Sequence, residues 1–411
     1  ACQNHVGASA ILKRKNMKIK QLHRLALALL GMGLSVSVWA EPLIVKIGSA
    51  APKTGGIAHL GIDNENGAQL AINEINAKGD LTIGGQKVIL QLVGEDDEGD
   101  PRKAGSVALK LYNEGVVAVV GHLNSGVSIP ANSIYAAANM VQVSPSSTNP
   151  VYTMWSIKTI NGNVSAYRVV AHDGTQNAAL AQYVTKNTKI RRIAIFDDST
   201  QYGVEGGREF AFNLENSKVK IVEHISVTDK TTDFYTDLVD LQGKQIDAIY
   251  WGGMDDVAAA LVKQMRELDI RAQLITVDGA CTDKFIELAG IAGEGTLCSQ
   301  SGLPLFKMAQ AKNFNKNYEK TFVGQKVQIY APFAYDAVYA IVEAMKIANS
   351  TLREAIVAAM PKVDFDGITG RIRFDIRGDI IDGPITIYKV SKQKFIPEVT
   401  IRVVSDLSKY Y

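Results

Sequence analysis

Cysteine is scarce in this sequence: three occur among 411 residues, and only Cys281 and Cys298 follow residue 40. The spacings C-x-x-C and H-E-x-x-H, which are typical of metal sites, are absent. None of the histidines after residue 40 has another at metal-ligand spacing: His59, His122, His172 and His224. The acidic run at residues 96–100 is either a metal cluster or a solvated loop with a helix cap, and we favour the loop. We therefore predict no metal site.

Motifs of nucleotide binding and covalent catalysis are also missing. No G-x-G-x-x-G follows a predicted strand, which argues against a dinucleotide site. Residues 48–54 resemble a phosphate-binding loop, but Pro52 stands where the glycine before the lysine is required. His122 lies near Ser125 without a G-x-S-x-G motif, so a structural histidine is the preferred interpretation. We predict no cofactor, no catalytic residue and no enzymatic activity.

The sequence has no apolar run of the roughly 18 residues that a membrane-spanning helix requires. Its strongest candidate follows the basic residues 17–20, runs over residues 25–34 and precedes a small-residue cleavage pattern at 38–40. This order is typical of a secretory signal peptide, and Met17 fits its start better than residue 1. We expect cleavage after Ala40 and an exported protein.

Strong charge of one sign is absent as well. Residues 1–40 hold six of the 44 lysines and arginines and none of the 42 acidic residues, so 38 basic residues remain against 42 acidic ones. No basic stripe with interleaved aromatic residues is left in the mature part. We therefore predict no nucleic-acid partner.

What the sequence does contain is a pair of strands that end in polar turns. Residues 116–120 form an apolar run rich in valine, typical of a buried parallel strand, and a turn with Ser125 leads to a helix near 128–138. The next strand, 140–143, ends in the hydroxyl-rich turn 144–150. Because helix N-termini and hydroxyls favour anions at the strand ends of an open α/β sheet, these turns predict an anion-binding crevice.

Strands and helices alternate in both halves of the chain, which predicts parallel sheets. The predicted strands are residues 43–48, 88–93, 116–120, 140–143, 192–196, 221–227, 248–251 and 274–277, and a closing β meander is expected at 370–374, 385–390 and 395–404. The later helices are expected near 234–241, 257–268, 314–322, 335–348 and 352–360. No low-complexity linker separates the halves. We predict two doubly wound α/β lobes with short crossovers and a hinge.

One acidic residue stands at a strand end of the second half. Asp278 follows the predicted strand 274–277 and would face the same cleft as Ser125 and Thr148 if the lobes open toward each other. The alternative is a helix cap for residues 282–288, and the residues alone leave both interpretations open.

Several segments together carry a family resemblance: residues 75–79, 96–101, 121–125, 144–148, 197–203 and 248–253. In this combination they resemble the Leu/Ile/Val-binding proteins of ABC importers, over about residues 43–390. The resemblance implies a type I periplasmic binding protein fold, in which two parallel-sheet lobes joined by three crossover strands close on an amino acid. The predicted division is lobe 1 at 41–160 plus 303–367 and lobe 2 at 161–302 plus 368–411.

The resemblance also implies the ligand site. It places carboxylate-binding hydroxyls on Ser125 and Thr148, and the acid for the ammonium group on Asp278, where the best-known members have glutamate. Leu60 and Met254 occupy positions where those members have tyrosine, so we expect a more apolar and adaptable wall. The full implied set of ligand-binding residues is Ser125, Ser146, Ser147, Thr148, Tyr202, Asp278, Leu60 and Met254.

The two cysteines after residue 40 are close in sequence, and an exported protein can keep a disulfide. We favour a Cys281–Cys298 bridge over two buried thiols. The first-lobe disulfide of the best-known members is missing, because its positions are Gly99 and Asn124 here.

The function implied by the resemblance is a periplasmic, monomeric receptor that captures an aliphatic or branched-chain amino acid and delivers it to the membrane permease of an ABC importer. The alternative is a ligand-sensing receptor or regulator on the same fold that binds an amide or a small carboxylate. A hydrolase or oxidoreductase would need a reactive constellation that the sequence lacks.

Overall fold

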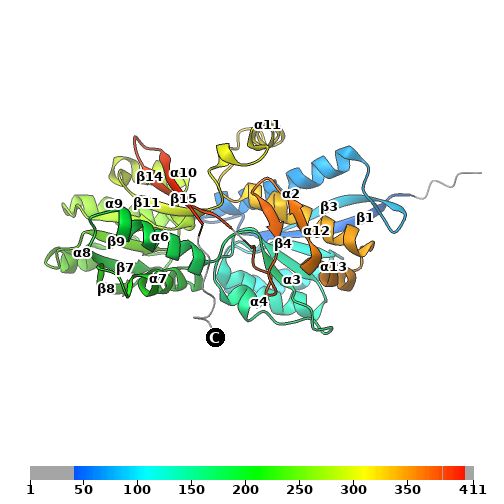
Figure 1. The fold of residues 1–411 in the computed structure, drawn as a ribbon, viewed down its shortest axis with the longest axis horizontal. Helices are drawn as coiled ribbons and strands as arrows, with labels where there is room; N and C mark the ends of the chain where they lie inside the picture. Colours follow the sequence, from blue (N-terminus) through cyan, green and yellow to red (C-terminus); the bar gives the residue numbers. More distant parts are fainter. Residues whose placement is uncertain (1–40, 382, 403–411) are drawn as a thin grey trace, which may run out of the picture. The chain divides into compact units, whose positions relative to one another are not determined.

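Each predicted α/β half has a sheet of its own in the computed structural model, which describes residues 41–381 and 383–402 (Figure 1). The predicted signal peptide, residues 1–40, lies outside the described residues, as does the end of the last predicted strand, 403–404. The described residues from Pro42 onward form one compact unit.

The first lobe contains a six-stranded sheet in the order β2-β3-β1-β4-β5-β6, in which β1 pairs in parallel with both β3 and β4. Its strands are β1 (Leu43–Ala51), β2 (Thr82–Ile83), β3 (Gln86–Asp96), β4 (Ala118–Gly121), β5 (Val141–Ser144) and β6 (Ala166–Arg168). Its helices and 3₁₀ turns are α2 (Ala58–Lys78), η1 (Pro101–Lys103), α3 (Ala104–Asn113), α4 (Ser125–Ala137), α5 (Val151–Met154), η4 (Leu305–Lys307), α11 (Ala311–Thr321), α12 (Ala331–Ala348), α13 (Arg353–Ala359) and η5 (Met360–Lys362).

The valine run of β4 shows why this sheet is covered on both faces. Ala118 and Val120 belong to the core formed with α2 and α12, whereas Val119 belongs to the core formed with α3 and α4. Successive side chains of a strand point to opposite faces, so an unbroken apolar run requires a cover on each. The prediction of a buried parallel strand at residues 116–120 is confirmed.

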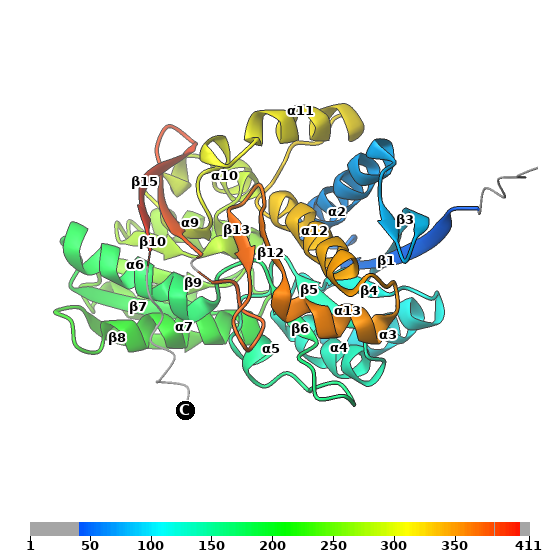
Figure 2. The same ribbon diagram turned by 45° about the vertical axis from the view of Figure 1, so that its right-hand side comes forward.

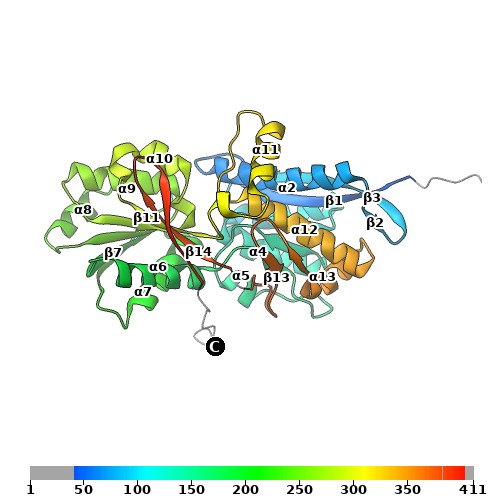
Figure 3. The same ribbon diagram turned by 45° about the horizontal axis from the view of Figure 1, so that its top comes forward.

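The second lobe contains a seven-stranded sheet in the order β15-β14-β11-β10-β9-β7-β8, with β14 and β15 antiparallel at one edge (Figure 3). Its strands are β7 (Arg192–Asp197), β8 (Lys220–Ser226), β9 (Ala248–Gly252), β10 (Gln273–Thr276), β11 (Leu297–Ser301), β14 (Ile385–Val390) and β15 (Phe395–Ile401). Its helices and 3₁₀ turns are α6 (Asp173–Asn187), α7 (Gln201–Leu214), α8 (Tyr235–Gln242), α9 (Asp255–Glu267), η2 (Asp278–Ala280), α10 (Asp283–Ala289) and η3 (Gly290–Gly293).

The chain passes between the lobes three times, after β6, after β11 and before β14. The lobe limits drawn from the sequence at 160, 302 and 367 stay a prediction. Sheet pairing keeps β6 in the first sheet, so the first passage lies after Arg168. Ile372 and Phe374 pack in the core of the first lobe, so the third passage lies after Phe374.

The predicted closing meander is wrong in one respect. Residues 371–373 form β13, which pairs with β12 (Asp364–Asp366) in a separate hairpin beside α12, not with β14 (Figure 2). The strand β12 is three residues long and carries two aspartates, so its pattern did not predict a strand. Helix α4 likewise begins at Ser125, three residues before the predicted start, because the Asn124 carbonyl already accepts bonds from Val127 and Ser128.

A disulfide joins Cys281 to Cys298 with a Cα–Cα distance of 5.7 Å, which confirms the predicted bridge. Cys281 directly follows η2, and Cys298 lies on the adjacent strand β11. Both residues are buried beside Tyr388. The bridge therefore fastens the short turn that begins at Asp278 to the sheet.

Replacing both cysteines with alanine is expected to lower the free energy of unfolding by about 3 kcal/mol, because the bridge restricts a loop of this length in the unfolded chain. Urea titration of the oxidised wild type and the double variant measures the difference. Reductant should lower the wild type to the level of the double variant and leave that variant unchanged. A wild type insensitive to reductant would contradict the prediction.

Among the residues that the structure describes, no helix combines the length and apolarity needed to cross a membrane.

Candidate functional site

The turn after β4 is held by His122, which lies fully inside the first lobe. Its Nδ1 lies 2.6 Å from Oδ2 of Asp97, and its Nε2 lies 3.0 Å from the hydroxyl of Tyr135. Both ring nitrogens are thus occupied away from Ser125, which confirms the structural interpretation of His122. The predicted solvated acidic loop is partly wrong: Asp100 does cap η1, but Asp97 is fully buried because it partners His122.

The hydroxyl residues of the first lobe meet at the ends of β4 and β5 as predicted, and all are buried. The hydroxyl of Ser125 accepts a bond from the amide of Asn149 (3.2 Å), and that of Ser146 accepts one from Nδ2 of Asn64 (3.1 Å). The hydroxyl of Thr148 has no partner among the described residues. Ser147 differs from the others, because its hydroxyl bonds to backbone carbonyls inside the lobe.

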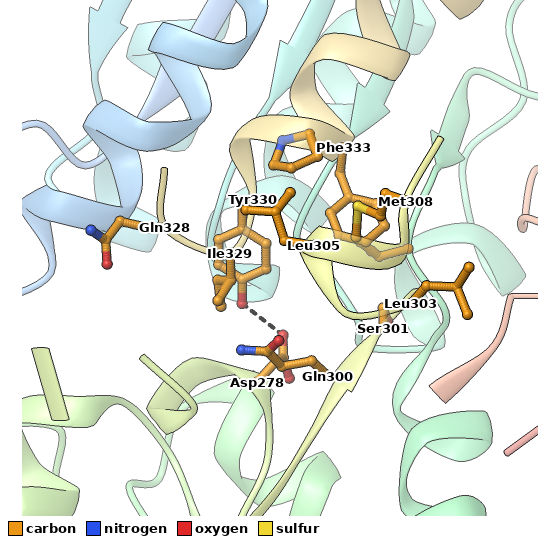
Figure 4. A pocket seen from close by; sticks show the side chains of 12 residues that line it. Asp278, Gln300, Ser301, Leu303, Leu305, Met308, Gln328, Ile329, Tyr330 and Phe333 are labelled. Carbon is orange, nitrogen blue, oxygen red and sulfur yellow. Dashed lines mark hydrogen bonds between the residues drawn. The ribbon is translucent and has the colours of Figure 1, made fainter. Parts of the chain in front are cut away.

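Asp278 enters from the second lobe, where β10 ends and η2 begins, and it is buried. One carboxylate oxygen accepts the hydroxyl of Tyr330 at 2.6 Å (Figure 4). The other accepts the hydroxyl of Tyr202 at 3.0 Å and Nε2 of Gln176 at 2.9 Å. The alternative of a helix cap is wrong, because the hydroxyl of Thr282 caps α10.

The electrostatics of Asp278 follow from its burial. Loss of water raises the pKa of its carboxyl group, and the donors from Tyr330, Gln176 and Tyr202 offset only part of that rise. All three donors are neutral, so the carboxylate meets no positive charge from their side chains. A ligand cation at this point would gain a charge-assisted hydrogen bond.

Two of these partners escaped the sequence analysis. Tyr330 directly precedes α12, and Gln176 lies on α6, whose weak amphipathic pattern did not predict a helix. Their hydrogen bonds to Asp278 span 52 and 102 residues of sequence. No local spacing connects such positions, so only a family motif could have identified them.

An apolar wall joins the two lobes beside Asp278. Leu60, Leu123 and Tyr330 of the first lobe form one buried cluster, and Met254 of the second lobe packs against it. The wall residues predicted from sequence, Leu60 and Met254, are thus brought together. Figure 4 shows a further hollow of about 40 Å³ on the other side of Tyr330, where Leu305, Met308 and Phe333 converge.

A larger cavity of about 1060 Å³ lies between the lobes. Both lobes line it, the first through residues 54–57 and Asn124, the second through residues 198–202 and Met254. Tyr202 therefore reaches both this cavity and the carboxylate of Asp278.

Direct polar contacts hold the lobes together at this cleft. Nε2 of His59 in α2 lies 2.8 Å from Oδ2 of Asp255 in α9, and the hydroxyl of Thr282 donates to the same oxygen. Nδ2 of Asn149 donates to the carbonyl of Gln201 across the lobes at 2.8 Å. Burial alone would lower the pKa of His59, but the hydrogen bond and charge of Asp255 outweigh it and raise the pKa.

The contact between His59 and Asp255 makes closure depend on pH. The pKa of His59 is higher in the closed state, so its contribution is complete below about pH 6.5 and is lost as pH rises through the raised pKa. We expect ligand affinity to fall above this range in the wild type relative to the His59→Gln variant. Calorimetric titration from about pH 6 to 9 measures the difference.

The matched control is His224→Gln, since His224 contacts Asp197 within the second lobe only. Lys284, which lowers the pKa of His59, and Asp256 stay in place in both variants. If the pH profiles of His59→Gln and His224→Gln coincide, the contact between His59 and Asp255 plays no part in closure.

Comparison with known proteins places this arrangement. A family model described as periplasmic binding protein matches residues 44–394. The chain belongs to the periplasmic binding protein family. A relative from Brucella suis, Leu/Ile/Val-binding protein homolog 1, is 32% identical over 346 residues, which cover 84% of this chain and 88% of the relative.

Solved structures of the family agree in fold. A leucine-binding protein from Thermotoga maritima is 27% identical with a TM-score of 0.76, and the match covers 87% of this chain and 98% of that protein. A substrate-binding protein from Desulfitobacterium hafniense in complex with leucine is 25% identical with a TM-score of 0.70 and covers 86% and 100%. These likenesses confirm the predicted type I fold with its parallel-sheet lobes.

In this periplasmic binding protein, the two positions that lack the first-lobe disulfide lie side by side. A Cβ atom at Gly99 would come within 3.2 Å of Oδ1 of Asn124. Gly99 and Asn124 also line the large cavity between the lobes. The roles of the eight residues as ligand contacts stay a prediction.

Proposed function

We propose that this periplasmic binding protein captures an aliphatic amino acid between its lobes and delivers it to the permease of an ABC importer. The observation that carries the proposal is the buried carboxylate of Asp278, which faces neutral donors at the contact between the lobes. A zwitterion needs an acid for its ammonium group and hydroxyls or amides for its carboxylate. Asp278 supplies the first, and Ser125 with Thr148 supplies the second.

The wall of the cleft points to the side chain of the ligand. Leu60, Leu123 and Met254 present no charged group, so an aspartate, glutamate, lysine or arginine ligand would bury its extra charge unpaired. The names of the relatives support the same class, since they bind leucine, isoleucine or valine. An amide- or carboxylate-sensing function would leave Asp278 without a cationic ligand group.

Export belongs to the same proposal. Delivery to an importer requires a mature protein in the periplasm, and cleavage after Ala40 would leave the described residues intact. The fold carries out capture and release without a chemical step, so no residue is assigned a catalytic role.

A thermal-shift screen of the mature protein against the common amino acids tests the proposal, because a ligand that binds only the folded state raises the apparent stability. Leucine, isoleucine and valine should give the largest shifts and displace one another in competition. Differences among them should be modest, since one methylene contributes roughly 0.8 kcal/mol. A charged amino acid that displaces leucine better than isoleucine does would refute the aliphatic assignment.

A further inference from the structure

Asp173, the first residue of α6, carries a second buried carboxyl group close to Asp278. Its side chain is fully buried, yet neither oxygen has a hydrogen-bond partner among residues 41–381 and 383–402. Burying a carboxylate without a partner is costly, and proteins avoid it unless a proton or a bound cation compensates. The fold itself therefore gives this carboxyl group no stabilising contact.

Further unpartnered polar atoms lie around Asp173. The amide of Asp173 donates to the carbonyl of Thr148 at 2.8 Å, and the hydroxyl of Thr148 is itself without a partner in the described structure. One turn along α6, Gln176 donates to Asp278 and to the carbonyl of Ser299, while Oε1 of Gln176 and the hydroxyl of Ser299 remain unbonded within the described part. Thr148 from the first lobe thus meets α6 and Asp278 from the second at a cluster of acceptors that lack donors.

The charges around Asp173 are mostly negative. Burial raises the pKa of its carboxyl group well above its usual range, and the charges of Asp278 and Glu205 raise it further. Arg168 acts in the opposite sense, but its guanidinium is already engaged by Asp379 at 2.6 Å. The remaining titratable groups that feel its charge are Tyr202, Tyr250 and Tyr330.

We propose that Asp173 is a second acid for the ammonium group of the ligand, so that the site requires a ligand with a cationic amine. This proposal rests on the proposed function and deepens it. Two neighbouring buried carboxyl groups cannot both ionise without a cation, so the empty site retains one proton. When the ammonium group binds, that proton passes to solvent and both carboxylates face the cation.

The arrangement defines the substrate class. An α-amino acid satisfies Asp173 and Asp278 together. A carboxylic acid of the same shape without the amine leaves two buried acids with no donor and is rejected. Selection for the amine and selection for an apolar side chain are then made by different parts of the cleft.

The Asp173→Asn variant tests this role with two probes, L-leucine and 4-methylpentanoate, which is leucine without its amine. Titration calorimetry of the wild type in phosphate and in Tris should show proton release on binding leucine and no binding of 4-methylpentanoate. The variant should bind leucine about tenfold more weakly or worse, release fewer protons and keep its thermal stability without ligand.

The matched control is Asp336→Asn. Asp336 is also fully buried, but it accepts bonds from the amides of Ile368 and Thr369 inside the first lobe. Its replacement should lower thermal stability and leave leucine affinity and proton release unchanged.

Two outcomes overturn the proposal. Equal leucine affinity and equal proton release in the wild type and Asp173→Asn would show that Asp173 does not contact the amine, while the proposed function stands. A wild type that binds no amino acid would refute the proposed function and this inference together.

Discussion

Replacing Asp278 with alanine is expected to weaken amino-acid binding by about tenfold or more while the protein remains folded. The ammonium group would lose a charge-assisted hydrogen bond, which contributes roughly 1.5–3 kcal/mol. The hydroxyls of Tyr202 and Tyr330 would also lose their shared acceptor. Because Tyr330 belongs to the first lobe, the variant loses a direct link between the lobes as well.

Calorimetric titration with leucine measures this effect, and circular dichroism checks the fold. Asp278→Glu is the matched control, because it keeps the carboxylate and introduces the residue of the best-known relatives. It should retain more affinity than Asp278→Asn, which keeps the shape and removes the charge. Unchanged affinity in Asp278→Ala would refute the assignment of the ammonium site.

The second large effect is expected from Gly67→Ala in the middle of α2. A Cβ atom there would lie 2.1 Å from the carbonyl oxygen of Ala331 and 2.7 Å from its Cα, closer than atoms can approach. The obstacle is the backbone of α12, which cannot rotate away as a side chain would. We expect a loss of about 3 kcal/mol or more in the free energy of unfolding.

This overpacking also reaches the ligand site. Ala331 follows Tyr330, and the amides of both donate to Asp63 on α2, at 2.7 and 2.9 Å. Separating α2 from α12 would displace the hydroxyl of Tyr330 from Asp278. Leucine affinity should therefore fall together with stability in the Gly67→Ala protein.

Gly105→Ala is the matched control, since Gly105 also lies in a helix and a Cβ atom there meets nothing within 4 Å. Alanine favours a helix over glycine by up to about 1 kcal/mol, so this variant should be as stable as the wild type or slightly more so. Urea denaturation of both variants makes the comparison. Equal stability of Gly67→Ala and Gly105→Ala would contradict the close approach of the two helices.

The candidate site was only partly predictable from sequence. Ser125, Thr148 and Asp278 each follow an apolar strand, and strand ends of parallel sheets converge, so their grouping could be expected. Tyr330 and Gln176 follow no such strand, and their link to Asp278 exists only after the chain has passed between the lobes. Asp173 was missed for the same reason, because α6 begins at the first of these passages.

The sequence by itself determined the two α/β halves, because unbroken valine- and isoleucine-rich runs must be covered on both faces, and it also pointed to the disulfide through the scarcity of cysteine. Only the tertiary structure decided which polar groups meet. Asp97 looked solvated and is buried against His122, and Asp278 was as compatible with a helix cap as with a binding site. The reason is physical: burial patterns are local and repeat along a strand or helix, whereas the hydrogen bonds of a buried acid depend on residues that folding brings from distant positions.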